Sequence, residues 1–104
     1  MTLLDFFKDE GEYQKIMDIL VDRRTCDPGT HFVIDQKKGF KNNMACLLKV
    51  LHSKGFYKDN RKPTSNEIQI ILKNTFALEL GIDTIKRADP LLTQFDYIPI
   101  SLSL

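Results

Sequence analysis

The chain has 104 residues, of which 42% are hydrophobic and 28% are charged. These values fit one domain, residues 1–104, and exclude two independent cores or disorder throughout. The net charge is only +1, but it is unevenly distributed. Residues 1–36 hold four basic and eight acidic side chains, residues 37–66 hold eight and one, and residues 67–104 hold three and five. The middle third therefore carries the positive field, and such clustering bears on the choice of partner more than the net value does.

The sequence also bears on the cellular compartment. No apolar run approaches the ~20 residues that a membrane-spanning helix needs, so we expect no membrane partner. The first residues lack the basic start and the long apolar stretch of a secretion signal. A secreted domain of this size would usually carry more than two cysteines, although one bridge between Cys26 and Cys46 stays open. We therefore predict a cytoplasmic protein.

Two elements stand out in the first half of the chain, after a short helical turn at the N-terminus. A helix is predicted over 10–24 because its apolar residues recur at positions i, i+3, i+4 and i+7, and Asp9 with Glu12 has the spacing of a capping box. A Pro-Gly turn follows at 27–29. Residues 31–35 are β-branched or aromatic in the main, which favours a strand.

Three helices and a second strand are predicted in the other half. Helical periodicity is clearest over 41–53, and a Thr-x-x-Glu capping box opens a further helix over 65–77. A short helix over 84–89 is ended by proline. Apolar residues nearly alternate from Ile98 onward, so we expect a strand that pairs with 31–35. The elements together predict a mainly α-helical domain with a small β component.

No arrangement of residues typical of an enzyme or a metal site is found. Four residues are of zinc-ligating types, but they show neither a paired-cysteine nor a paired-histidine spacing: Cys26, His31, Cys46 and His52. The last two would point about 120° apart on their helix. A Cys–His pair without a motif stays open, while Gly-x-Ser-x-Gly and phosphate-binding glycine loops are absent. We predict no catalytic residue, no metal and no cofactor.

The basic segment is the remaining signal. It comprises residues at both ends of the central helix: Lys37, Lys38, Lys41, Lys49, Lys54, Lys58, Arg61 and Lys62. Such a patch can neutralise the phosphates of a nucleic acid. The alternatives are an ordinary solvated surface that balances the acidic N-terminal helix, and a contact between the two halves within one chain or across a dimer.

One stretch of the chain resembles a known family. It contains Leu47-Leu48-x-x-Leu51-His52-x-x-Gly55, then Glu67-Ile68, then Phe76 and Leu80-Gly81. Residues 44–89 thereby resemble the C-terminal region of the RteC family, regulators of conjugative elements in Bacteroides-type bacteria. The resemblance implies a helical module of winged-helix or helix-turn-helix character that acts in DNA-linked transcription regulation of a mobile element. It implies no catalytic residue and no cofactor.

These observations lead to two predictions of function. The first is a regulatory, non-enzymatic module that binds double-stranded DNA. Its expected contacts are Lys58, Arg61 and Lys62 to the backbone, and Lys86 and Arg87, at the start of a recognition helix, to bases. The second is a protein-interaction module, such as a homodimer, that associates through the apolar C-terminal segment 95–104.

Overall fold

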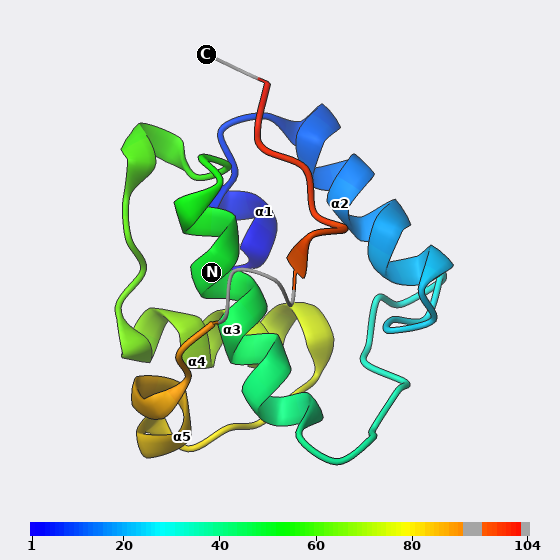
Figure 1. Ribbon diagram of the computed structural model, residues 1–104, viewed down its shortest axis with the longest axis vertical. Helices are drawn as coiled ribbons and strands as arrows, with labels where there is room; N and C mark the ends of the chain where they lie inside the picture. Colours follow the sequence, from blue (N-terminus) through cyan, green and yellow to red (C-terminus); the bar gives the residue numbers. More distant parts are fainter. Residues whose placement is uncertain (91–94, 103–104) are drawn as a thin grey trace.

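A central helix organises the molecule, which we describe from a computed structural model that covers residues 1–90 and 95–102. The helical elements are α1 (Leu3–Phe6), α2 (Glu10–Asp22), α3 (Phe40–Ser53), the 3₁₀ turn η1 (Lys58–Asn60), α4 (Ser65–Phe76) and α5 (Ile82–Arg87). Helix α3 lies between α2 on one side and the chain from η1 to the start of α4 on the other (Figure 1). Residues 44–48, 50 and 51 of α3 are all buried, as expected for a helix that other elements surround.

The predicted helices are confirmed, and side-chain caps show why α2 and α4 begin where they do. The Asp9 carboxylate accepts hydrogen bonds from the backbone N–H groups of Gly11 and Glu12, each at 3.3 Å, and so starts α2. Thr64 and Glu67 form the predicted capping box of α4. The capping box predicted for Asp9 and Glu12 is not formed, because the Glu12 carboxylate accepts hydrogen bonds from the C-terminal segment instead.

The predicted strands are wrong for the part of the chain that the structure describes. Within 31–35 only Val33 pairs, in an isolated bridge with Cys26, and its N–H donates to Phe76 O at 3.2 Å. The predicted pairing of 31–35 with the C-terminal segment is also absent as far as residue 102, the last one described. That segment instead crosses the end of α3, where Ser101 N donates to Lys54 O at 2.9 Å. Ser103 and Leu104 lie outside the described residues.

The core joins the N-terminus to the middle of the chain. Phe7 and Tyr57 form an antiparallel bridge, and their rings meet edge to face with centroids 5.8 Å apart. The Tyr57 hydroxyl donates to Leu48 O at 2.6 Å. From the other end of the chain, Phe95 and Ile98 are buried in the same cluster. One continuous core therefore includes both ends of the described chain.

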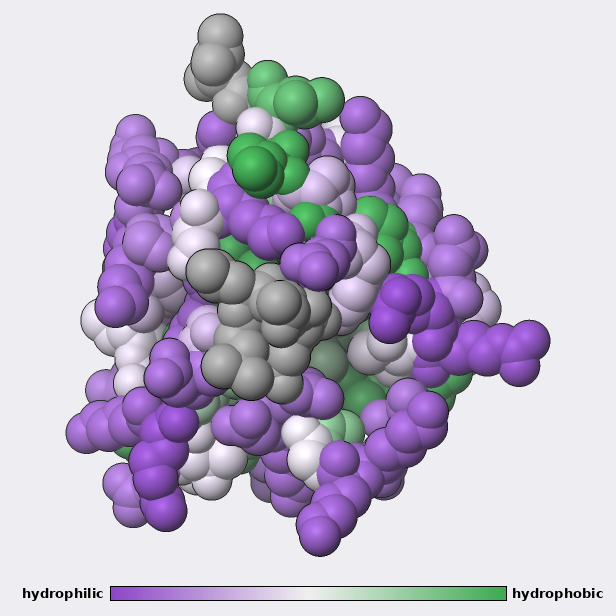
Figure 2. Space-filling view, viewed as in Figure 1, coloured by the Kyte–Doolittle hydropathy of each residue, from purple (hydrophilic) through white to green (hydrophobic). Residues whose placement is uncertain are grey.

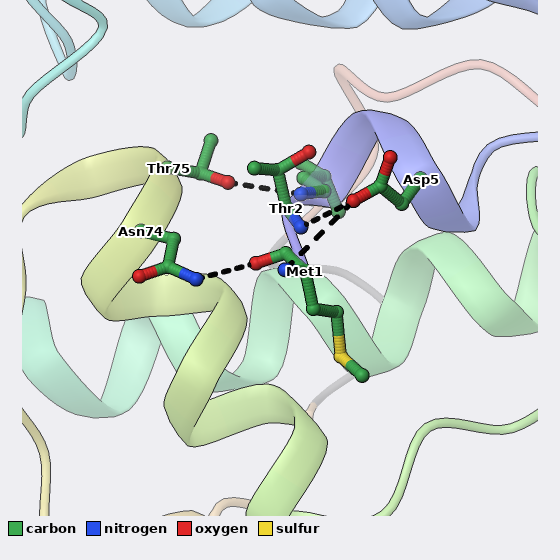
Figure 3. Close-up of polar contacts among 6 residues, drawn as sticks. Met1, Thr2, Asp5, Asn74 and Thr75 are labelled. Carbon is green, nitrogen blue, oxygen red and sulfur yellow. Dashed lines mark hydrogen bonds and ion pairs between the residues drawn. The ribbon is translucent and has the colours of Figure 1, made fainter.

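Polar contacts hold the first residues against the end of α4 (Figure 3). Leu3 N donates to Thr75 Oγ1 at 2.9 Å, and Asn74 Nδ2 donates to Met1 O at 2.7 Å. Thr2 N donates to the Asp5 carboxylate at 2.8 Å, as part of a capping box at the start of α1. No helix in the described residues has the length and apolar character that crossing a bilayer requires.

Candidate nucleic-acid interface

The five predicted DNA contacts lie on three neighbouring segments. Lys58 belongs to η1, Arg61 and Lys62 lie between η1 and α4, and Lys86 and Arg87 form the last turn of α5. All five side chains are exposed. In Figure 1, η1, the start of α4 and α5 follow one edge of the molecule, away from α2.

Arg61 is engaged within the protein. Its guanidinium forms an ion pair with Glu67 and lies over the Phe6 ring, 5.1 Å from the centroid. The pKa of Glu67 is lowered, first by the backbone hydrogen bond from Thr64 and also by the charge of Arg61. This arginine therefore ties the segment before α4 to α1 and α4, and much of its charge is already balanced.

Lys62 and Lys86 line the same groove. The groove has a volume of about 770 Å³ and lies between the end of α3, the start of α4 and the end of α5. Its polar lining includes His52, Ser53, Lys62, Ser65, Lys86 and Asp89. We call it the Lys62–Lys86 groove. The contribution of Ser53 and Ser65 was not predicted, because no local pattern indicates that the ends of three helices meet.

Helix α5 differs from its predicted bounds. It was expected over 84–89, but it begins at Ile82 after Gly81 and ends at Arg87. Lys86 and Arg87 consequently lie at its C-terminal end instead of its start. Six residues correspond to about 9 Å of helix, at 1.5 Å per residue. The geometry therefore does not support base contacts by these two residues, whereas their exposed position suits contacts with phosphates.

Two lysines of the basic segment bind carbonyl oxygens inside the protein. Lys49 Nζ donates to Ile85 O at 2.7 Å and to Ala88 O at 2.5 Å, at the C-terminal end of α5. Lys54 Nζ donates to Phe95 O at 3.0 Å and to Ile98 O. A cation is favourable at a helix C-terminus such as that of α5. Fewer lysines of the basic segment are therefore free to bind a partner than its composition indicated.

The residues considered for catalysis or metal binding are not arranged for either. Cys26 and Cys46 are buried, free thiols. Burial raises the pKa of Cys26 to about 12, so its thiol stays protonated at neutral pH and is a weak nucleophile. Among residues 1–90 and 95–102, no group of three or more His, Cys, Asp or Glu side chains is placed to hold a metal ion.

Comparison of the chain with protein-family models, curated proteins and solved structures finds no match. The resemblance of residues 44–89 to the RteC family therefore stays a prediction. The class that the structure itself defines is a mainly helical domain with a cationic groove at one edge.

Proposed function

We propose that this chain is a regulatory module that binds double-stranded DNA through the edge formed by η1, residues 61–64 and α5. The observation that carries the proposal is the meeting of Lys62 and Lys86, far apart in sequence, at one groove. Exposed Lys58 and Arg87 extend the same edge. Ammonium groups on a common surface suit a chain of phosphates, and their affinity for DNA falls as salt rises.

The helix-turn-helix character belongs to the same proposal. Helices α4 and α5 are consecutive and joined by residues 77–81, and Gln69 Nε2 on α4 donates to Leu80 O in that connection at 2.8 Å. The short α5 ends in basic residues, which supports contacts with the DNA backbone. The winged-helix character rests on the family resemblance, and the described residues contain no strand that would form a wing.

The test is binding to a fluorescently labelled duplex of random sequence across a salt series. We expect binding at low salt that weakens linearly on a log–log plot, with a slope of about −0.9 for each phosphate contacted. Replacing Lys58, Lys62, Lys86 and Arg87 by Ala should remove most of the affinity. The control loses the same charge elsewhere: Lys37, Lys38, Lys41 and Lys73 replaced by Ala. Absence of binding at low salt contradicts the proposal.

A second candidate function is protein interaction, which the exposed end of the chain favours. Ile100 is 71% exposed and Leu102 is 88% exposed, while Ile98 is buried. Figure 2 shows hydrophobic surface gathered near this end of the chain. Ile100 also lines a groove of about 580 Å³ together with Val50 and Gly55. An exposed apolar patch of this kind suits self-association.

The test must leave Ile98 in place, because a deletion that starts there removes a core residue. Ile100→Ser combined with Leu102→Ser removes only exposed apolar surface. If the segment mediates dimerisation, this variant sediments as a monomer at concentrations at which the parent protein is a dimer. A parent protein that is monomeric throughout the concentration series contradicts this candidate.

A further inference from the structure

We propose that the Lys62–Lys86 groove holds one backbone phosphate of the duplex between its two exposed lysines, with the Ser65 hydroxyl as a further donor. The inference rests on the proposed function and names the ligand group that the groove takes. It also separates the candidate contacts: Lys62 and Lys86 bind the phosphate, whereas Arg61 stabilises the fold.

The charges that line the groove favour an anion. Three lysines and one acidic residue, Asp89, are among its described lining residues. The ammonium of Lys49 is directed to two carbonyl oxygens at the end of α5. Lys62 and Lys86 are the lysines that remain exposed there, and no hydrogen bond or ion pair within residues 1–90 and 95–102 engages either one. Phosphate oxygens accept charge-assisted hydrogen bonds from such groups.

The backbone that carries each lysine is held by contacts within the fold. Lys62 precedes the buried Pro63 and the capped start of α4. Lys86 belongs to the last turn of α5, which Lys49 holds through the carbonyls of Ile85 and Ala88. Groups on a fixed scaffold lose less entropy when they bind a ligand.

The groove does not depend on the N-terminus of α4. Thr64 and Glu67 already cap that end reciprocally, so its backbone donors are partly used. What the start of α4 offers is Ser65, whose side chain is half-buried and lines the groove. Two ammonium groups and one hydroxyl are sufficient donors for one phosphodiester, which carries a single charge.

Two cations of another basic region of the surface have partners within the fold. Near the start of α3, Lys37 lies 3.7 Å from the Asp35 carboxylate. Arg23 lies over the Tyr97 ring, 3.8 Å from its centroid. Lys38 and Lys41 are exposed in the same region and supply a charge-matched control.

The experiment compares Lys62→Ala/Lys86→Ala with the control Lys38→Ala/Lys41→Ala in the duplex salt series. Each variant loses two positive charges from exposed positions, so thermal melts should show both folded. The groove variant should bind roughly tenfold more weakly at low salt, and its salt slope should fall by about 0.9, the value for one phosphate. The control variant should keep the slope of the parent protein.

Three results would overturn the inference. A slope that falls by about 1.8 would mean that the two lysines contact separate phosphates. Equal losses in the groove and control variants would mean that a diffuse positive field, and not the groove, binds the duplex. An unchanged groove variant would place the contact elsewhere. Absence of binding by the parent protein is a different result, because it contradicts the proposed function itself.

Discussion

At the scale of single residues, Tyr57 links two parts of the core through a polar atom. Its ring is 1% exposed and its hydroxyl donates to Leu48 O at 2.6 Å. We expect Tyr57→Phe to lower the free energy of unfolding by about 1–2 kcal/mol, because the buried carbonyl loses a donor. Urea unfolding followed by circular dichroism measures this. Tyr13→Phe is the matched control, since the described residues give its hydroxyl no hydrogen bond, and an equal loss there would contradict the argument.

Residue types alone did not distinguish free cations from engaged ones. Arg61, Lys49 and Lys54 all counted toward the predicted basic segment, yet each has partners within the fold. Their partners lie in loops or at the ends of other helices, where no periodic spacing connects donor and acceptor. Lys62 and Lys86 were predicted as contacts, but their position at one groove follows only from the packing of α4 and α5.

At the scale of elements, the residue that ends α4 has an unfavourable backbone conformation that a substitution can relieve. Ala77 caps this helix in the left-handed conformation, at φ 53° and ψ 38°, and its side chain is exposed. A Cβ is unfavourable there, and glycine is the usual residue. Glycine removes this strain but also adds conformational entropy to the unfolded chain. We expect the net effect of Ala77→Gly to be a rise of about 0.5–1 kcal/mol in the free energy of unfolding. Thermal unfolding checks it, with Ala77→Val as the opposite control, which should lose stability.

The clamp on α5 permits a second prediction about an element. Replacing Lys49 by Met removes the ammonium that binds Ile85 O and Ala88 O while it keeps the length of the side chain. We expect a loss of about 1–3 kcal/mol in the free energy of unfolding, as for other hydrogen bonds from charged donors. Hydrogen exchange should show α5 opening first. Lys41→Met on the same helix is exposed and should change little; equal effects of the two would contradict the clamp.

Helices α2 and α4 were predictable because each combines an apolar period with a side-chain cap, and α3 was predictable from its apolar period, whereas the strands were not. Residues 31–35 have strand-forming side chains, but Phe32 and Ile34 are exposed and only Val33 packs inward. A strand needs a partner with free backbone groups. The C-terminal segment does not supply one, because Glu12 binds its Ser101 and Leu102 and Lys54 binds the carbonyls of its Phe95 and Ile98.

At the scale of the whole molecule, charge is separated across the fold. The acidic helix α2 and the basic edge at η1 and α5 lie on different sides of α3 (Figure 1). The sequence located the positive third of the chain but not this arrangement, because α5 belongs to a different third with a net negative charge. Such separation would orient the molecule as it approaches DNA and is the physical basis for steered association.

The core as a whole should also make the fold sensitive to alkaline pH. Burial raises the pKa of Cys26 from its ordinary 9.0 to about 12, and burial likewise raises the pKa of the Tyr57 phenol above its ordinary 10.0. Below pH 9 both groups are protonated in the folded and unfolded chains, so stability is independent of them. Above pH 9 the Cys26 thiol loses its proton in the unfolded chain but keeps it in the folded chain. Above pH 10 the Tyr57 phenol likewise loses its proton in the unfolded chain only. Stability must therefore fall as pH rises.

We expect the free energy of unfolding to decline above pH 9 by up to about 1.4 kcal/mol per pH unit for each such group. Urea titrations from pH 7 to 11 measure the decline. Cys26→Ala should flatten the curve between pH 9 and 10, where the thiol of the unfolded chain ionises first, and Tyr57→Phe should flatten it only above pH 10. The two variants thereby separate a thiol effect from a phenol effect within one core. Stability that stays level to pH 11 in the parent protein would show that these groups ionise without unfolding and would contradict their burial.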